Sequence, residues 1–264
     1  MQVDALASGS SGNAYLVRAG ETAVLLEAGL PASRLARILT GLAFHPGRLA
    51  GILLTHAHSD HLLGARELSD RYQLPIYATA GTLSHRALRG SPLARPLEPG
   101  RVFELGELEL LPFRVPHDCV EPVGFRLTSQ QATLCLTTDL GFVPDEVQPL
   151  LEGADLLVLE ANHDEQMLWS GPYPAFLKNR VGGENGHLSN LEAARCLAGL
   201  RRPPRDVWLA HLSLVNNRVA RALGVVGARL VEAGFAHIAL AAVGRNRPSV
   251  SWRSDRPAQQ LRLF

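Results

Sequence analysis

Cysteine, lysine and long apolar runs are scarce in this sequence, and each scarcity excludes a class of protein. The three cysteines, Cys119, Cys135 and Cys196, are an odd number at unrelated spacings. This pattern excludes a disulfide framework and a CxxC metal site, and it predicts a reducing, cytoplasmic environment. No apolar run approaches the roughly 20 residues of a membrane helix, and residues 1–20 lack the layout of a signal peptide. We therefore expect no membrane contact.

The residues that are present describe a folded chain. Hydrophobic residues make up 46% of the 264 residues and charged residues 19%, which excludes a disordered or collagen-like protein. A chain of this length can bury about 75% of the surface that it exposes when unfolded. Because we find no repeat, low-complexity segment or flexible linker, we predict a single domain over residues 1–264.

The net charge of +1 hides an uneven distribution of charge. Residues 1–200 carry 15 basic and 22 acidic side chains, whereas residues 201–264 carry 11 basic side chains, all arginine, and 3 acidic ones. GC-rich codon usage explains arginine in place of lysine but not the loss of acids. Arginine suits phosphate, so we expect a basic track at the rim of the site. Its candidates are Arg201, Arg202, Arg205, Arg245, Arg247, Arg253 and Arg256.

Short apolar runs alternate with helical patterns along the chain. Strands are predicted at 24–26, 52–54, 123–127, 134–137, 156–159 and 207–210. Helices are predicted over 62–72 and 218–232, and a capping-box pattern, Ser189-Asn-Leu-Glu192, predicts a third helix that begins there. The stretches 90–100 and 169–186 are predicted to be irregular.

The strongest chemical signal is Thr55-His-Ala-His-Ser-Asp-His61, which follows a buried strand and precedes a helix. A loop at the carboxyl end of a strand can turn several side chains toward one point. Gathering His56, His58, Asp60 and His61 there is costly unless they share a cation. Nitrogen and oxygen ligands without a thiolate suit Zn²⁺ or Mn²⁺.

Further candidate ligands stand at other strand ends. His117 follows residues 113–116, Asp139 ends the strand near 134–138, and His211 ends the strand 207–210. Each alone is a weak signal, because a histidine at a strand end is commonly a satisfied polar residue. Their order after the histidine motif makes them convincing together.

With these residues the sequence resembles the metallo-β-lactamase superfamily. The resemblance implies an α/β fold, a four-layered αββα sandwich, with a site for two divalent metal ions along the sheet edges. It also implies the ligands: His56, His58 and His117 for one metal, Asp60, His61 and His211 for the other, and Asp139 as the bridge.

Six segments are similar to the WalJ (YycJ) group of that superfamily: residues 6–13, 138–141, 159–164, 171–174, 186–190 and 210–213. The group implies a metal-dependent 5′-to-3′ DNA exonuclease, in which a hydroxide activated by two metal ions attacks phosphorus. One departure is visible, because the aspartate of the group's Leu-Val-Asp-Ala-Gly segment is Glu27 here. Glu27 is expected to be a buried partner of the histidine loop that accepts the same hydrogen bonds.

Other polar residues have two readings each. The turn Ser8–Asn13, with Ser11 and Asn13, is either a phosphate-binding loop or a hairpin that uses glycine for positive φ. Ser189 is explained as a helix cap, and Lys178 as a solvated charge, but both are also candidates for substrate binding. Cys119 is read as a small buried residue rather than a ligand.

Glu160 and His187 form a second polar set. Glu160 closes a strand, and His187 stands just before a helix start, where a charged donor and free backbone N–H groups can bind an anion. The phosphodiesterase branches of the superfamily have a comparable carboxylate and a Gly-His-x-Ser segment at their phosphate site, which resembles Gly186–Ser189. We predict Asp60, Glu160 and His187 as the catalytic side chains.

Two other functions compete with a nuclease that acts on DNA or possibly RNA. A small-substrate hydrolase, such as a glyoxalase II-like thioesterase, would use the same metal site but has no need of the arginine-rich C-terminal region. A non-enzymatic scaffold is disfavoured because all seven ligand positions are occupied. The residues indicate neither the metal nor the oligomeric state.

Overall fold

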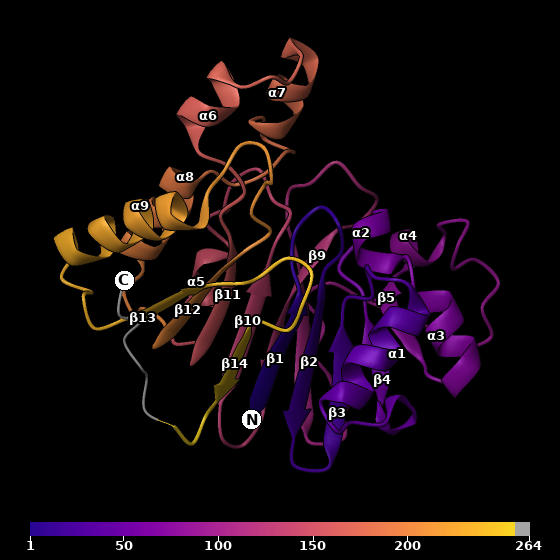
Figure 1. The fold of residues 1–264 in the computed structure, drawn as a ribbon. Coiled ribbons are helices and arrows are strands. Elements are labelled where there is room, and N and C mark those ends of the chain that lie inside the picture. The colour runs from indigo at the N-terminus through magenta and orange to yellow at the C-terminus, as the bar shows by residue number, and fades with distance from the viewer. Residues whose placement is uncertain (257–264) are drawn as a thin grey trace. The chain divides into compact units, whose positions relative to one another are not determined.

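The computed structural model describes residues 1–256, and its internal contacts divide the chain into two compact units (Figure 1). Unit 1 comprises residues 1–114, 119–131 and 244–255, and unit 2 comprises residues 115–118 and 132–243. The histidine loop, Thr55–His61, belongs to unit 1, whereas His117, Asp139, Glu160, His187 and His211 belong to unit 2. The single domain predicted from the sequence stays a prediction.

Unit 1 contains a seven-stranded sheet in the order β14-β1-β2-β3-β4-β5-β6. Its strands are β1 (Gln2–Ala7), β2 (Ala14–Ala19), β3 (Thr22–Leu26), β4 (Gly51–Leu53), β5 (Ile76–Thr79), β6 (Ala94–Leu97) and β14 (Val250–Arg253). The pairs β14-β1, β1-β2 and β2-β3 are antiparallel, and the pairs from β3 to β6 are parallel. Parallel pairing places the carboxyl ends of β3 and β4, and hence Glu27 and the histidine loop, at the same edge.

An antiparallel meander completes the strands of unit 1: β7 (Phe103–Leu105), β8 (Leu108–Arg114) and β9 (Val123–Thr128). The helices of this unit are α1 (Ala32–Gly41), η1 (Pro46–Arg48), α2 (Ser59–Leu62), α3 (Ala65–Tyr72) and α4 (Ala80–Leu83). The apolar face of α1, with Leu35 and Leu39, and Leu68 of α3 join the core cluster that includes Ile52 and Ile76 of the sheet. This helix-on-sheet core anchors the strand β4 that precedes the histidine loop.

Unit 2 is built on four parallel strands: β10 (Thr133–Thr137), β11 (Leu156–Glu160), β12 (Asp206–Ala210) and β13 (Ala239–Ala242). Nearly all residues of β10, β11 and β12 are buried, as expected for parallel strands, whereas β13 at the edge is mostly half-buried. The helices are α5 (Gln148–Leu151), α6 (Glu165–Ser170), α7 (Ala175–Val181), α8 (Asn190–Gly199) and α9 (Val219–Glu232). Helices α8 and α9 contact each other, whereas α6 and α7 project beyond them (Figure 1).

The structure confirms the predicted strands and most of the helices, including the Ser189 capping box at α8. The helix predicted over 62–72 is interrupted between α2 and α3 at Gly64, where a Cβ would lie 2.2 Å from the Leu30 carbonyl oxygen, so the close backbone approach requires glycine. The prediction of irregular structure was wrong in part, because residues 90–100 contain β6 and residues 169–186 contain α7 and the end of α6. Their glycines and prolines lie mainly at the ends of these short elements.

The position expected for Arg201, Arg202 and Arg205 is also wrong. These residues precede the amino end of β12, whereas His211 follows its carboxyl end. Six residues of extended chain at about 3.3 Å each place Arg205 roughly 20 Å from His211. The first two are tied to the start of the neighbouring strand, where the Arg201 N–H donates to Glu152 and the Arg202 carbonyl accepts from Gly153. They therefore lie at the opposite end of the unit 2 strands from Asp139 and His211.

Candidate metal and catalytic site

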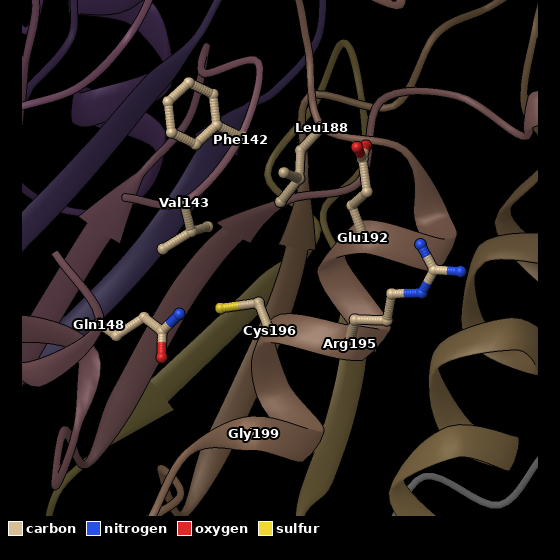
Figure 2. Close-up of a pocket in the computed structure, with 8 residues that line it drawn as sticks. All are labelled: Phe142, Val143, Gln148, Leu188, Glu192, Arg195, Cys196 and Gly199. Carbon is tan, nitrogen blue, oxygen red and sulfur yellow. The ribbon is translucent and has the colours of Figure 1, made fainter. Parts of the chain in front are cut away.

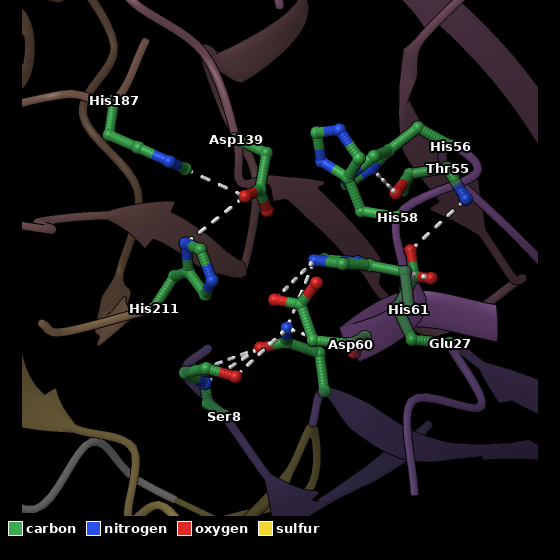
Figure 3. A network of polar contacts seen from close by, with 12 residues as sticks. Ser8, Glu27, Thr55, His56, His58, Asp60, His61, Asp139, His187 and His211 are labelled. Atoms are coloured by element: carbon green, nitrogen blue, oxygen red, sulfur yellow. Dashed lines mark hydrogen bonds and ion pairs between the residues drawn. The ribbon is translucent and has the colours of Figure 1, made fainter. Parts of the chain in front are cut away.

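The polar centre of unit 2 stands at the carboxyl ends of three adjacent parallel strands. Asp139 follows β10, Glu160 is the last residue of β11, and His211 follows β12. Asp139 and His211 have positive φ angles of 62° and 54°, a conformation that is uncommon for non-glycine residues. Their side chains converge, with His211 Nδ1 3.1 Å from Asp139 Oδ1 (Figure 3). The same His211 Nδ1 lies 2.8 Å from Glu160 Oε1.

Glu160 is the acceptor on which this centre is organised. It is fully buried, and its Oε2 accepts hydrogen bonds from the backbone N–H groups of Leu140 and Leu188, both at 3.1 Å. Its Oε1 lies 2.9 Å from the Nδ1 of His187 and 2.8 Å from that of His211. An ionised carboxylate can only accept, so both Nδ1 atoms carry hydrogen and both imidazoles are held with Nε2 on the far side of the ring.

The titration of this centre follows from burial and ion pairing. Burial raises the pKa of Glu160, but the charge of His187 and the hydrogen bonds from both imidazoles outweigh it and lower that pKa to about 2. Burial alone would lower the pKa of His187, whereas the Glu160 carboxylate raises it above the ordinary value. The nearby His163 has no such bond, and burial lowers its pKa to about 4.

His117 belongs to the same unit and lies beside this centre. Its Nδ1 is 3.1 Å from the Gly186 carbonyl oxygen, and its Nε2 is 4.0 Å from Asp139 Oδ1. The rings of His117 and His187 are 5.2 Å apart between centroids. Of the two imidazoles bound to Glu160, His187 is the more accessible, since its side chain is 21% exposed and that of His211 is 2% exposed.

The histidine loop of unit 1 connects β4 to α2. Thr55 Oγ1 is 2.8 Å from His56 Nδ1, which leaves His56 Nε2 facing His58 Nδ1 at 3.1 Å (Figure 3). The rings of His56 and His61 are 4.1 Å apart between centroids, and both side chains are buried. The His61 Nε2 lies 3.6 Å from Asp60 Oδ2. The loop thus gathers three imidazoles and one carboxylate within the six residues 56–61.

Glu27, which directly follows β3, contacts both the backbone and an imidazole of this loop. It is fully buried with a φ of 65°, accepts the Thr55 backbone N–H at 3.1 Å and lies 3.3 Å from His61 Nδ1. Nearby Gly29 permits a close backbone approach, because a Cβ there would lie 1.7 Å from the Asp60 carbonyl oxygen. Glutamate in place of aspartate therefore reaches both the loop backbone and an imidazole.

The residues predicted to bind substrate lie in varied surroundings. Asn13 is buried and its amide contacts the Asp60 carbonyl oxygen and His61 Nε2 at 3.3 and 3.0 Å, whereas exposed Ser11 donates to Asn246. Ser189 caps α8 and is buried. Lys178 Nζ donates to the Trp169 carbonyl oxygen at 2.7 Å. Substrate contacts by these four residues stay predictions.

A separate pocket of about 240 Å³ lies in unit 2 between α8 and the 142–148 segment (Figure 2). It is lined by Phe142, Val143, Gln148, Leu188, Glu192, Arg195, Cys196 and Gly199, none of which is a predicted ligand. Burial raises the pKa of the Cys196 thiol to about 12, so the thiol stays protonated at neutral pH. All three cysteines are free, and Cys119, half-buried, accepts the Ala57 backbone N–H through its sulfur.

Two positioning residues were missed by the sequence reasoning. The Asn162 side-chain amide donates to the His211 carbonyl oxygen at 2.8 Å and so helps to hold the backbone whose φ is positive. Thr55 had no predicted role in the motif, yet its hydroxyl, 2.8 Å from His56 Nδ1, sets the orientation of His56. Asn162 lies in the segment 159–164, two residues after Glu160, which was the available signal.

The donor atoms of unit 2 fit a divalent metal ion. One ligand atom from each of Asp139, Glu160, His187 and His211 lies within 4.8 Å of the others. Because the Nδ1 atoms of both imidazoles are bonded to Glu160, the donors left for a Zn²⁺ or Mn²⁺ ion are their Nε2 atoms and the Asp139 carboxylate. This group includes Glu160 and His187, which the resemblance did not assign as ligands. In unit 1 the nitrogens of His56 and His58 converge in the same manner.

Comparisons with known proteins place the chain in a family. The profile described as the beta-lactamase superfamily domain matches residues 23–212. The chain belongs to the metallo-β-lactamase superfamily. Within it, the chain is 35% identical over 235 residues to the exodeoxyribonuclease YycJ of Bacillus anthracis, covering 87% of this chain and 89% of that protein. It is 34% identical to the exodeoxyribonuclease WalJ of Streptococcus pneumoniae, covering 80% of this chain and 81% of that protein. The chain is thus a member of the YycJ/WalJ group.

The predicted α/β fold class is confirmed by solved structures. The metallo-β-lactamase fold protein YhfI of Bacillus subtilis matches with a TM-score of 0.73 at 19% identity, covering 96% of this chain and 99% of that one. Among the described residues, no helix is both long enough and apolar enough to span a membrane.

Proposed function

We propose that this protein is a metal-dependent hydrolase that acts as a DNA exonuclease. The observation that carries the proposal is the convergence of Asp139, Glu160, His187 and His211 at three strand ends, in a chain whose relatives YycJ and WalJ are exodeoxyribonucleases. The 5′-to-3′ direction and a cytoplasmic location belong to the same proposal.

The proposed cofactor is a pair of divalent ions, Zn²⁺ or Mn²⁺. The ligands would be those that the resemblance implies: His56, His58, Asp60, His61, His117, Asp139 and His211. The pair would supply Lewis acidity toward the phosphate and lower the pKa of water. The support from this chain is that every one of these residues is a nitrogen or oxygen donor, and that the donors within each unit converge.

The remaining polar residues would position the imidazoles and protonate the leaving group. Glu160, which is buried under four donors, would hold His187 and His211 rather than touch the substrate. His187 is the better candidate to donate a proton from Nε2 to the leaving 3′ oxygen, because it is the more exposed imidazole and its Nδ1 is already fixed. Glu27 would fix His61 and the loop backbone.

The first test is the fate of labelled nucleic acid. Protein loaded with Zn²⁺ or Mn²⁺ is incubated with 5′-labelled and 3′-labelled single-stranded DNA, duplex DNA and RNA, and the products are resolved by length. We expect mononucleotides released from the 5′ end of DNA, each with a 5′-phosphate. Hydrolysis of a thioester, with every nucleic acid left intact, would replace the proposal with the glyoxalase II-like alternative.

The second test removes one proposed ligand from each unit. His58→Ala and Asp139→Ala should abolish hydrolysis, lower the metal content and reduce the gain in thermal stability on metal addition, because a ligand that binds only the folded state stabilises it. Val231→Ala, which truncates an exposed side chain on α9, is the control and should behave as the parent. Normal turnover by either ligand variant would contradict the proposed site.

A further inference from the structure

Helices α6 and α7 present an unusual surface for the edge of a folded unit. Helix α7 has no buried residue, although its sequence, Ala-Phe-Leu-Lys-Asn-Arg-Val, contains several apolar side chains. Phe176 is 74% exposed and Trp169, at the end of α6, is 52% exposed. The pair projects from the rest of unit 2 (Figure 1). Two large aromatic side chains are thus held in solvent, where they stabilise the fold little.

These aromatic residues are held on a defined support. Lys178 Nζ donates to the Trp169 carbonyl oxygen at 2.7 Å and so joins the two helices. The Trp169 ring lies against Gly182, the residue that ends α7, because a Cβ at Gly182 would be 3.4 Å from the ring. One edge of the indole, at Cζ2, therefore lies beside Gly182, while about half of the residue stays accessible.

Helix α7 is also joined directly to the polar centre of unit 2. The His187 backbone N–H donates to the Val181 carbonyl oxygen at 2.9 Å, and Arg180 Nε donates to Asp118 Oδ2 at 2.6 Å, next to His117. From Phe176 to Val181 the helix rises only about 8 Å. This is two to three nucleotides at the roughly 3.4 Å rise of a stacked strand. The backbone path from Phe176 to His187 is therefore short, of a length that a few nucleotides span.

The chemistry of the surface indicates its occupant. Residues 165–184 contain two basic residues, Lys178 and Arg180, and two exposed acidic residues, Glu165 and Glu184, so their formal charges cancel. Arg180 is also paired with Asp118, so the exposed aromatic side chains, rather than net charge, carry the affinity of this surface. Exposed aromatic faces beside cations bind unpaired bases by stacking, without reading their sequence. A protein partner would instead bind through apolar contact area, for which an aliphatic side chain would serve as well as an aromatic one.

We propose that Trp169 and Phe176 form a stacking platform for unpaired bases of a single-stranded nucleic acid that extends from the polar centre at His187. This inference rests on the proposed nuclease function and adds where the strand is held. The platform selects single strands, because paired bases in a duplex do not expose their faces. It belongs to a different edge of unit 2 from Arg201, Arg202 and Arg205.

The test uses the full chain with variants of Phe176. Phe176→Ala should weaken binding of a fluorescent 12-nucleotide single strand, measured in EDTA to prevent cleavage, by roughly tenfold, the scale of one stacked base. Phe176→Trp should restore binding, whereas Phe176→Leu, which keeps apolar area without an aromatic face, should remain weak. The salt slope of the affinity should be unchanged in all three, because no phosphate contact is lost. Val231→Ala is the matched exposed control.

Fluorescence gives a direct readout, because Trp169 is exposed whereas Trp208 and Trp252 are buried. The single strand should quench the exposed tryptophan in the parent, and Trp169→Phe should lose the quenching while it keeps an aromatic face. With metal-loaded protein, hydrolysis of bis(p-nitrophenyl) phosphate should be the same in parent and Phe176→Ala, whereas kcat/KM for the long strand falls.

The possible failures are distinguishable. If the parent degrades DNA but Phe176→Ala binds and cuts as the parent does, the platform is refuted and the nuclease stands. If the parent binds and quenches as described but cuts no nucleic acid, the nuclease is refuted and the platform stands. If Phe176→Leu binds like the parent, or if sedimentation shows a parent dimer that Phe176→Ala dissociates, the surface is an apolar protein contact and the platform is refuted.

Discussion

Replacing Glu160 with glutamine tests whether one buried carboxylate organises the polar centre of unit 2. The side chain accepts four donors at 2.8 to 3.1 Å: the N–H groups of Leu140 and Leu188, and the Nδ1 atoms of His187 and His211. Glutamine has nearly the same shape but one oxygen and one NH₂ group. If its oxygen keeps the two backbone donors, its NH₂ group confronts both imidazoles.

The cost of Glu160→Gln can be worked from these contacts. Two charge-assisted hydrogen bonds, each contributing about 1.5–3 kcal/mol, are replaced by weaker or reversed ones. We expect the free energy of unfolding to fall by about 2–4 kcal/mol, which corresponds to roughly 5–15 °C in Tm. An imidazole that turns its Nδ1 into an acceptor is neutral and carries its hydrogen on Nε2, so it can neither coordinate a metal through Nε2 nor act as an imidazolium proton donor. Activity should fall further than stability alone explains.

The assay combines urea unfolding, metal content and turnover at a temperature where the variant is folded. Glu232→Gln is the matched control, since Glu232 is exposed and pairs with Arg229 at 3.0 Å, a kind of contact that contributes about 1 kcal/mol or less. An unfolding free energy and a kcat for Glu160→Gln equal to those of the parent would refute the view that this carboxylate fixes both imidazoles.

Three further predictions follow from single residues. His187→Ala should lower turnover of DNA by roughly 10²–10⁴-fold with both metals retained, as checked by elemental analysis, and loss of metal would instead identify His187 as a ligand. His163, with its pKa lowered to about 4, stays neutral in the folded chain while the unfolded chain binds a proton below about pH 6.5, so its contribution to stability is present above that pH and is lost as the pH falls. Urea unfolding should show about 2 kcal/mol less loss of stability between pH 7 and 5 in His163→Asn than in the parent, and equal losses would contradict the assignment. Gly29→Ala places a Cβ against the Asp60 carbonyl oxygen, so it should cost about 3 kcal/mol or more in thermal unfolding, whereas Gly199→Ala, which meets nothing within 4 Å, should be tolerated.

The sequence alone determined the family and named the candidate donor residues. Three histidines and an aspartate within six residues are costly without a cation, so the motif carries its chemistry in its spacing. The strands that precede Asp139 and His211 were also predicted, because their apolar runs have no other stable environment than a buried sheet. Local patterns sufficed wherever the cause was local, as in the Ser189 capping box.

Only the tertiary structure decided which side chains meet. Glu160 is separated by 27 residues from His187 and by 51 residues from His211 along the chain. Their contacts arise from the order of the parallel strands, which no short segment of the sequence encodes. The same order places Arg205 and His211 at opposite ends of β12, although they are neighbours along the chain. Exposure of Phe176 and Trp169 was equally hidden, because an apolar residue in a sequence is expected to be buried, and only the fold shows that within residues 1–256 no other segment buries α7.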